Sequence, residues 1–372
     1  MNFSYWEQKE WIGKPDLVVI GSGITGLSAA YFAKKQHPDW HILVLERGML
    51  PWGASSRNAG FACFGSLGEL LDDLNHHDPE EIKQLVLQRY QGLQGLLSTF
   101  GTDRIGFHRW GGYELFRDSE AWEEALANRE RINDWLKYDL GPELFRQTDN
   151  TFGFSGIQGL LFNPLEGQLD TGRLMQCLLE MVQRSGILVL NGAQVEEWSE
   201  NPSQVTISVQ GHPDIQASRV LICSNGFAQS WLGDSVQPAR AQVLVTKPMP
   251  HLNIQGTFHL DRGYYYFRNI DGRVLLGGGR QLDKQGETTT EMVTTDLIQS
   301  DLRTLMNEVI LPGQKWELER SWSGIMGVGS SKSPWIAPVS DRVGCAVRLG
   351  GMGVALGMET GKRAALLAGE LG

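Results

Sequence analysis

The 372-residue chain has little cysteine, no long apolar run and no cluster of positive charge. Its four cysteines never form a CxxC pair, a usage that favours a reduced, cytoplasmic setting over a disulfide framework. No stretch of 18 apolar residues occurs, so no transmembrane segment is expected. The formal charge of −10, without a Lys/Arg stripe, argues against a nucleic-acid partner and against a polybasic membrane anchor.

Several catalytic motifs are missing as well. The chain contains no HExxH, no GxSxG and no zinc-spaced cysteines, so metal catalysis and a serine nucleophile have no support. His76 and His77 are adjacent and would point apart in a helix or a strand, which argues against a shared metal. We therefore predict no metal site, and no acid–base dyad is evident from the residue spacing.

The most informative segment present is a short apolar strand, Asp16 to Ile20, followed by a glycine-rich turn. Gly21, Gly23 and Gly26 have the spacing of a dinucleotide-binding turn, in which the backbone and the start of the next helix approach a pyrophosphate. A second apolar strand ends at Glu46, whose carboxylate suits the hydroxyls of a ribose. The pattern predicts a nucleotide-binding βαβ unit.

The length and the order of the patterns predict two domains of α/β character, α+β overall. Helical periodicity covers 27–35, 79–137, 172–185 and 295–309, and the range 106–116 within the second of these resembles a strand. Alternating strands between 187 and 223 suggest an inserted β-meander, and 238–330 is rich in strands. The last 25 residues repeat the order of strand, glycine turn and helix.

Nucleotide-type segments return at three distant places, namely 46–60, 220–226 and 349–357. A nicotinamide-binding domain usually takes its contacts from one contiguous stretch. An extended cofactor needs dispersed loops, because its two ends lie far apart. The scatter therefore favours FAD, and a nicotinamide dehydrogenase is the less favoured alternative.

On these segments the chain resembles the D-amino-acid-oxidase-like family of FAD-dependent oxidoreductases, closest to its γ-glutamylputrescine oxidase and glycine oxidase branches. The resemblance rests on Gly21-Ser-Gly-Ile-Thr-Gly26, Glu46-Arg47, Gly53-Ala-Ser-Ser-Arg-Asn-Ala-Gly60, Asp170-Thr-Gly-Arg-Leu174 and Gly350-Gly-Met-Gly-Val354. It implies a split Rossmann-like FAD-binding domain (1–80, 150–235 and 335–372). A mostly antiparallel β-sheet domain for substrate would comprise 81–149 and 236–334.

The resemblance also implies which residues hold the cofactor. Near the pyrophosphate it places Gly21, Ser22, Gly23, Ile24, Thr25 and Gly26, and near the adenosine it places Glu46, Arg47 and Val195. On the flavin side it places Ala54, Ser55, Ser56, Arg57, Asn58, Ala59, Gly60 and Phe61. The loop with Ser224, Asn225 and Gly226, and the segment with Gly351, Met352, Gly353 and Val354, would complete the site.

The chemistry implied is oxidation of the C–N bond of an amine or amino acid by hydride transfer to flavin N5, giving an imine that hydrolyses. The electrons would pass to oxygen or to a carrier. Tyr266, Arg268 and Arg57 are the predicted catalytic residues. Strand alternation predicts Tyr264, Tyr266 and Arg268 on one face and Tyr265 on the other. Packing aromatics and structural ion pairs are the plainer interpretations of these residues.

One departure from the family pattern concerns the substrate. The segments 324–329 and 351–357 contain no Arg or Lys, which disfavours a simple α-amino acid anchored there. Arg240, Arg268 and Arg280 are the alternative guanidinium groups for a carboxylate. A dehydrogenase with a non-oxygen acceptor and a flavin-binding redox protein without turnover stay open. Lys332 is expected to be a solvated loop charge, and Cys63 is not expected to be attached to flavin.

Overall fold

The computed structural model describes residues 2–372. Its α-helices are α1 Ile24–Gln36, α2 Leu67–Leu74, α3 Pro79–Phe100, α4 Ser119–Leu140, α5 Thr171–Arg184, α6 Gln229–Leu232, α7 Asp296–Leu305 and α8 Gly353–Glu370. Over the described residues, every helix is too short or too polar to span a bilayer.

The first part of the fold is a six-stranded sheet, with the order β18-β19-β12-β1-β2-β8. Its strands are β1 Leu17–Ile20, β2 Ile42–Glu46, β8 Leu188–Asn191, β12 Val220–Ile222, β18 Trp335–Pro338 and β19 Val343–Val347. All pairs are parallel except β18–β19. The central strand β1 is buried throughout, as a continuous apolar run between helical layers predicts.

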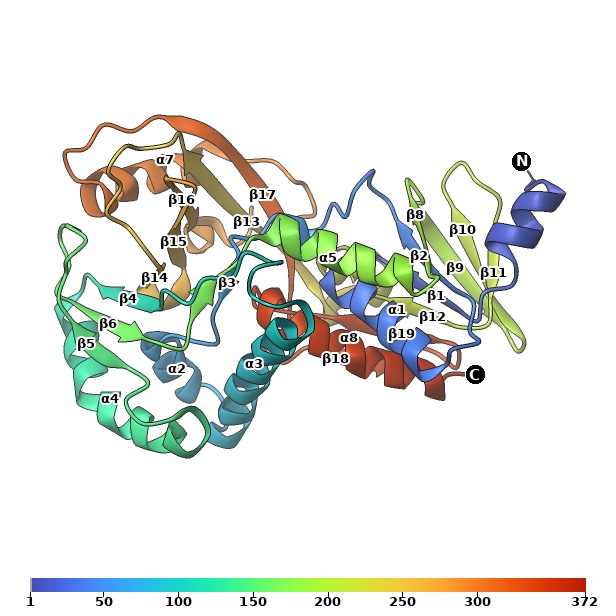
Figure 1. The fold of residues 1–372 in the computed structure, drawn as a ribbon, viewed down its shortest axis with the longest axis horizontal. Coiled ribbons are helices and arrows are strands. Elements are labelled where there is room, and N and C mark those ends of the chain that lie inside the picture. The colour runs from blue at the N-terminus through green and yellow to red at the C-terminus, as the bar shows by residue number, and fades with distance from the viewer. Residues whose placement is uncertain (1) are drawn as a thin grey trace.

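The two faces of this sheet have different covers. Helices α1, α5 and α8 pack on one face through Leu27, Leu174 and Ala364. The other face contacts an antiparallel meander of β9 Val195–Asn201, β10 Gln204–Val209 and β11 Ile215–Ala217, through Val205 and Ile207. The predicted meander is therefore present, and it closes the parallel sheet on the side away from the helices (Figure 1).

The second part is an eight-stranded sheet, with the order β17-β13-β16-β15-β14-β4-β6-β5. Its strands are β4 Gly112–Phe116, β5 Arg146–Thr148, β6 Gly159–Asn163, β13 Gln237–Thr246, β14 Thr257–Leu260, β15 Tyr265–Ile270, β16 Arg273–Gly278 and β17 Leu318–Val328. Only β4 and β14 pair in parallel. Helix α7 covers one face through Ile298 and Leu302.

Figure 1 shows the two sheets in separate lobes, with α7 and α4 around the eight-stranded sheet and both chain termini at the far end of the other lobe. A short pair, β3 Phe61–Ala62 and β7 Gly167–Gln168, lies in the chain segments that connect them. The parallel sheet takes its strands from three separate stretches of the chain. This distribution supports our proposal of a split cofactor domain.

Some predicted elements differ from the observed ones. The strand expected over 106–116 begins only at Gly112, and before it His108 forms an isolated bridge with Gln168. The helix expected to Val309 ends at Leu305 and continues as a π-turn. Strand β6 pairs with β4 in the eight-stranded sheet, although it falls inside 150–235, the range predicted for the cofactor domain.

Candidate functional site

A cavity of about 790 Å³ lies between the two sheets and is lined by segments that are far apart in sequence. Most of the residues predicted for the cofactor or the reaction line it, namely Gly21, Gly23, Ile24, Thr25, Glu46, Arg47, Ala54, Ser55, Arg57, Asn58, Ala59, Phe61, Val195, Ser224, Asn225, Tyr266, Gly351, Met352, Gly353 and Val354. Gly23 and Met352, which are more than 300 residues apart, thus share one cavity.

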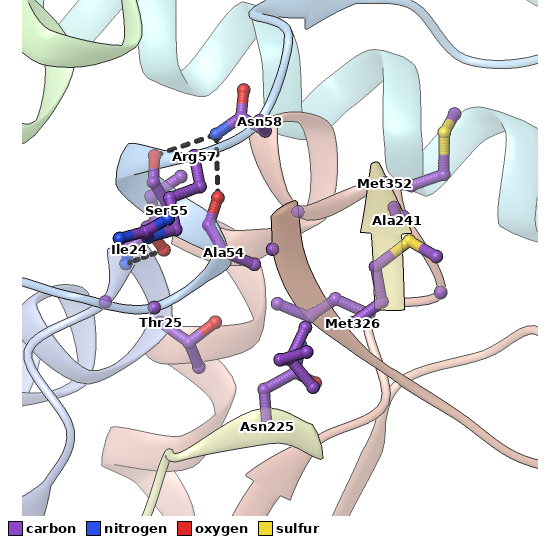
Figure 2. Close-up of a pocket in the computed structure, with 18 of the residues that line it drawn as sticks. Ile24, Thr25, Ala54, Ser55, Arg57, Asn58, Asn225, Ala241, Met326 and Met352 are labelled. Carbon is purple, nitrogen blue, oxygen red and sulfur yellow. Dashed lines mark hydrogen bonds between the residues drawn. The ribbon is translucent and has the colours of Figure 1, made fainter. Parts of the chain in front are cut away.

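Figure 2 shows how the main segments face one another. Ala54, Ser55, Arg57 and Asn58 lie on one side of the cavity, next to Ile24 and with Thr25 below them. Met326, Ala241 and Met352 lie on the other side, with Asn225 below them. The loops predicted from three distant stretches of sequence therefore surround the same space.

Six predicted residues are not part of the lining: Ser22, Gly26, Ser56, Gly60, Gly226 and Arg268. Two of the glycines permit close backbone contacts behind it. A Cβ at Gly60 would lie 2.3 Å from the carbonyl oxygen of Leu169, and one at Gly226 would lie 2.3 Å from that of Met326. These positions support the wall of the cavity instead of forming its surface.

The first glycine turn has the geometry that its spacing predicts. Gly21 has a φ of +106°, which L side chains rarely adopt. A Cβ at Gly26 would lie 1.9 Å from the carbonyl oxygen of Gly21, so only glycine lets α1 approach the turn this closely. Helix α1 has Gly23 as its N-cap, and the hydroxyl of Ser55 accepts the N–H of Ile24 at 2.9 Å. The positive end of the helix therefore opens onto the cavity.

Glu46 and Arg47 form the next part of the wall. The buried carboxylate of Glu46 accepts hydrogen bonds from the Ser22 hydroxyl at 2.8 Å and from the Gly48 N–H at 2.9 Å. The Ser22 N–H donates to the same oxygen as its hydroxyl, Oε2, at 3.2 Å. These bonds hold the carboxylate in place, and Oε1, which accepts only from Gly48, keeps a second lone pair for a ligand. The Arg47 guanidinium lies 3.7 Å from the ring centroid of Phe227, and burial lowers its pKa despite the opposing charge of Glu46.

The loop after β2 is fixed by its own hydrogen bonds. The Asn58 amide donates to the carbonyls of Ala54 and Ser55, and its oxygen accepts the N–H of Gly60 at 2.8 Å. The Arg57 guanidinium donates to the carbonyl of Ser323 at 3.0 Å, which ties the loop to β17. Burial lowers the pKa of Arg57. The loop thus presents a fixed surface between the two sheets.

Strand β15 supplies the aromatic part of the wall. Tyr264, directly before β15, and Tyr266 line the cavity, whereas Tyr265 packs in the core under α7 and donates to Asp301 at 2.8 Å. Burial raises the pKa of Tyr266 to about 12, so its hydroxyl remains a neutral donor at physiological pH. The predicted alternation is present, and it directs two tyrosines toward the cavity.

The structure separates the three arginines considered as carboxylate anchors. Arg240 is buried in a two-bond ion pair with Glu287, at 2.9 and 2.8 Å. Arg268 is 3% exposed and donates to the carbonyls of Gly60 and Leu169 at 3.1 and 2.8 Å. The prediction that Arg268 acts at the substrate is therefore wrong in its geometry, because the guanidinium lies behind the loop it supports. Burial lowers its pKa to about 10.

Arg280 is the one of the three that lines the cavity. Its side chain makes a single weak bond, from Nη2 to the Thr288 hydroxyl at 3.4 Å, and its buried Nε has no hydrogen-bond partner among the described residues. Burial lowers its pKa, against the opposing charges of Glu287 and Tyr264. A partly desolvated guanidinium without an ion pair in the described chain is suited to an anion from outside it.

Several charged lining residues were not predicted. Glu69 and Asp72 from α2 meet Arg262 and Lys332 from two remote loops, and Arg262 Nη1 lies 2.8 Å from Asp72 Oδ1. Lys332 also pairs with the buried Asp73, so the loop charge, which is 40% exposed, takes part in ion pairs that were not expected. The three segments that carry these residues are far apart in the sequence and meet only because α2 contacts the two loops. Neither the charge pattern nor the residue spacing of the sequence indicates the cluster.

Cys63 and His259 also line the cavity. The four cysteines are free and buried, and burial raises the pKa of the Cys63 thiol. Among residues 2–372, no group of three or more His, Cys, Asp or Glu side chains has the arrangement of a metal site.

The comparison with known families agrees with this arrangement. The family described as FAD dependent oxidoreductase matches residues 16–367, so the chain belongs to that family. FAD is thus the cofactor, and the chain is an FAD-dependent oxidoreductase. The cavity fits such a group: it has a backbone turn too close for side chains, an open helix N-terminus and a buried carboxylate acceptor, and its volume is at the upper end for ligand sites.

Individual relatives are distant. Prenylcysteine oxidase 1 from Bos taurus is 26% identical over 173 residues, which are 46% of this chain and 34% of that protein. Dimethylglycine dehydrogenase from Rattus norvegicus is 24% identical over 276 residues, 72% of this chain and 30% of that protein. The chain therefore spans about a third of the length of these curated relatives.

The fold has a much fuller match. The crystal structure of glycine oxidase from Geobacillus kaustophilus superposes with a TM-score of 0.76 and 19% identity, covering 96% of this chain and 95% of that one. At this identity the likeness concerns the fold. It confirms the predicted mixed α/β architecture of the D-amino-acid-oxidase-like family.

Proposed function

We propose that the protein oxidises the C–N bond of a small amine or amino acid with bound FAD. The observation that carries this proposal is the single cavity shared by the Gly21–Gly26 turn, the 54–61 loop, the Gly351–Val354 segment and the aromatic face of β15. Bound FAD supplies a hydride acceptor. Dimethylglycine dehydrogenase and glycine oxidase, both similar to this chain, are named for nitrogen-bearing substrates.

In this proposal, the side chains at one end of the cavity bind the cofactor, and those at the other end bind the substrate. The backbone around Gly23 and the positive end of α1 would hold the pyrophosphate, and Glu46 would accept from ribose hydroxyls. Arg47 and the backbone of Val195 would contact the adenosine, as their common position on the lining suggests. The remaining predicted lining residues, including those at Gly351–Val354, would surround the flavin.

At the other end, the substrate would lie against Tyr264 and Tyr266. The ring faces can hold an alkyl chain, and the neutral Tyr266 hydroxyl can donate a hydrogen bond. Arg280 replaces Arg268 in our assignment of the residue that binds an anionic group of the substrate. On the opposite side, the segment 324–329 contains no Lys or Arg, and Met326 from this segment gives the cavity an apolar surface.

The test is anaerobic reduction of the bound cofactor. Purified protein is expected to be yellow, and extraction is expected to release FAD. Addition of amines from a panel of primary amines, N-alkyl amino acids, α-amino acids and γ-glutamylputrescine should bleach the flavin band for at least one class. A colourless protein that takes up no FAD, or a flavin that no amine reduces, would contradict the proposal.

The electron acceptor defines a second candidate within the same chemistry. Among the proteins similar to this chain, one is named an oxidase and another a dehydrogenase. Peroxide formation in air distinguishes oxygen as acceptor from a carrier, which instead requires an added dye for turnover. Bound flavin that stays oxidised with every amine would favour a redox protein without turnover.

A further inference from the structure

A second, much smaller cavity of about 10 Å³ lies directly behind the wall of the large one. Its polar lining includes Glu114, Asn163, Glu166 and His259. Of these, His259 also lines the large cavity, so its imidazole forms part of the partition between the two spaces.

Two polar atoms at the small cavity lack partners in the described chain. They are Nε2 of His259 and Nδ2 of Asn163. Nε2 of His259 is 3.7 Å from Oε2 of Glu166, slightly too far for a direct hydrogen bond. A volume near 10 Å³ suits one water molecule, which needs the two to four polar partners that this lining offers.

The two carboxylates are buried and held by the protein. Glu114 accepts from the Ser66 hydroxyl at 2.9 Å and from the Gly68 N–H at 2.9 Å. Burial raises its pKa to about 7, with these hydrogen bonds opposing the rise, so it can take or release a proton near neutrality. Glu166 accepts the N–H of Phe64 at 3.2 Å.

The groups that face His259 come from every element around it. They are Cys63 beside β3, Glu69 on α2, Glu114 on β4, Glu166 before β7 and Tyr266 on β15. Burial alone would lower the pKa of His259, but the neighbouring Cys63 and the carboxylate of Glu166 outweigh it and raise the pKa well above its usual range. The Cys63 thiol stays neutral because burial raises its own pKa. The imidazolium therefore has a carboxylate beside it and a protonatable carboxyl within the same small cavity.

We propose that His259, with Glu166 and Glu114 behind it, is a proton relay that accepts the ammonium proton of the substrate from the large cavity. This inference rests on the proposed function, because oxidation at the carbon needs the nitrogen lone pair that an ammonium lacks. The Nε2 proton of the imidazolium first passes through the small cavity to the carboxylate of Glu114, and the neutral imidazole that remains then takes the proton of the substrate ammonium. One N–H bond of the substrate breaks, one O–H bond forms on Glu114, and no electron moves in this step.

The test uses the FAD-bound enzyme with an amine that reduces its flavin. Rates of anaerobic flavin reduction are measured from about pH 6 to pH 10 for wild type, His259→Gln and Glu114→Gln. We expect His259→Gln to be slower by about 100-fold at neutral pH, since general-base catalysis contributes 10²- to 10⁴-fold. The deficit should shrink as pH approaches the pKa of the amine, because the substrate then arrives neutral.

Glu114→Gln should remove the part of the rate profile that changes near neutral pH. It retains a side-chain oxygen at the position of Oε1, which accepts from both Ser66 and Gly68, so it tests the relay even where His259→Gln does not fold. The matched control is His212→Gln, a change of the same type on an exposed turn. Its rate profile should equal that of wild type.

The outcome distinguishes this inference from the proposed function. If wild type is bleached by amines but both variants, with normal FAD content and melting temperature, keep its rates and pH profile, the relay is wrong and the oxidation stands. If no amine bleaches wild type, the proposed function fails first. A merely structural role for His259 would lower stability or FAD content without changing the shape of the pH profile.

Discussion

The Gly26→Ala substitution should weaken FAD binding more than a substitution of Gly21 or Gly23 by alanine in the same turn. The new Cβ would lie 1.9 Å from the carbonyl oxygen of Gly21 and 3.1 Å from its carbon. Normal C···O contacts are about 3.3–3.6 Å, so α1 and the turn must separate by more than about 1 Å. The separation affects the backbone N–H groups of Gly23 and Ile24 at the open end of α1.

Overpacking of this kind costs about 1–3 kcal/mol. If most of that cost falls on the cofactor-bound conformation, the dissociation constant of FAD rises about 5- to 150-fold. Titration of the apoprotein with FAD, followed by flavin fluorescence, measures the change directly. Urea unfolding of the apoprotein shows how much the substitution lowers the free energy of unfolding when no cofactor is bound.

The matched control is Gly95→Ala on the exposed side of α3. A Cβ there would meet no heavy atom of the described chain within 4 Å. It should stabilise the protein by about 0.5–1 kcal/mol through helix propensity and leave FAD affinity unchanged. Wild-type affinity and stability in Gly26→Ala would refute the close-approach argument, since the turn would then tolerate a side chain.

Three further predictions concern the charged residues Arg280, Arg240 and Glu114. Arg280→Met should raise the KM for amines that carry a carboxylate by about 10- to 100-fold and leave uncharged amines unaffected, as steady-state kinetics will show. Arg240→Met should destabilise the protein by about 3–5 kcal/mol in urea unfolding, because Glu287 is left buried and unpaired. Glu114 has a folded pKa of about 7 against an ordinary 4.5, so it binds more proton when folded. Stability should therefore fall by about 3 kcal/mol as pH rises from about 4.5 to 7, and Glu114→Gln should lack this fall.

The sequence was sufficient to predict the nucleotide half of the fold because its features are local. The glycine spacing at Gly21 and Gly26 reflects backbone geometry that only a few neighbouring residues decide. The capped start of α5 at Asp170, which accepts the N–H of Arg173 at 3.0 Å, is local in the same way. The family resemblance then related the distant Gly351–Val354 segment to that turn, and both do line one cavity.

The roles of the charged side chains were harder to predict, because they depend on which residues meet in space. Arg240, Arg268 and Arg280 look equivalent in the sequence, as each follows or lies on an apolar strand. One is bound to Glu287, one supports the Gly60 loop, and one lines the cavity. The strand assignment and the alternation of side chains could not separate them, since the partner residues come from other elements.

The same limit explains why no acid–base group was expected from residue spacing. His259, Glu114 and Glu166 lie far apart in the chain, and they meet because β14 pairs in parallel with β4, with His259 directly opposite Glu114. A slip of one residue in this pairing would turn His259 to the other face of the sheet, away from the cavity. The proposed relay thus depends on the register of the one parallel pair in an otherwise antiparallel sheet. Substitutions that weaken this pair should alter the pH profile of flavin reduction before they affect the binding of FAD, because the Gly21–Gly26 turn, where we propose that FAD binds, follows a strand of the other sheet.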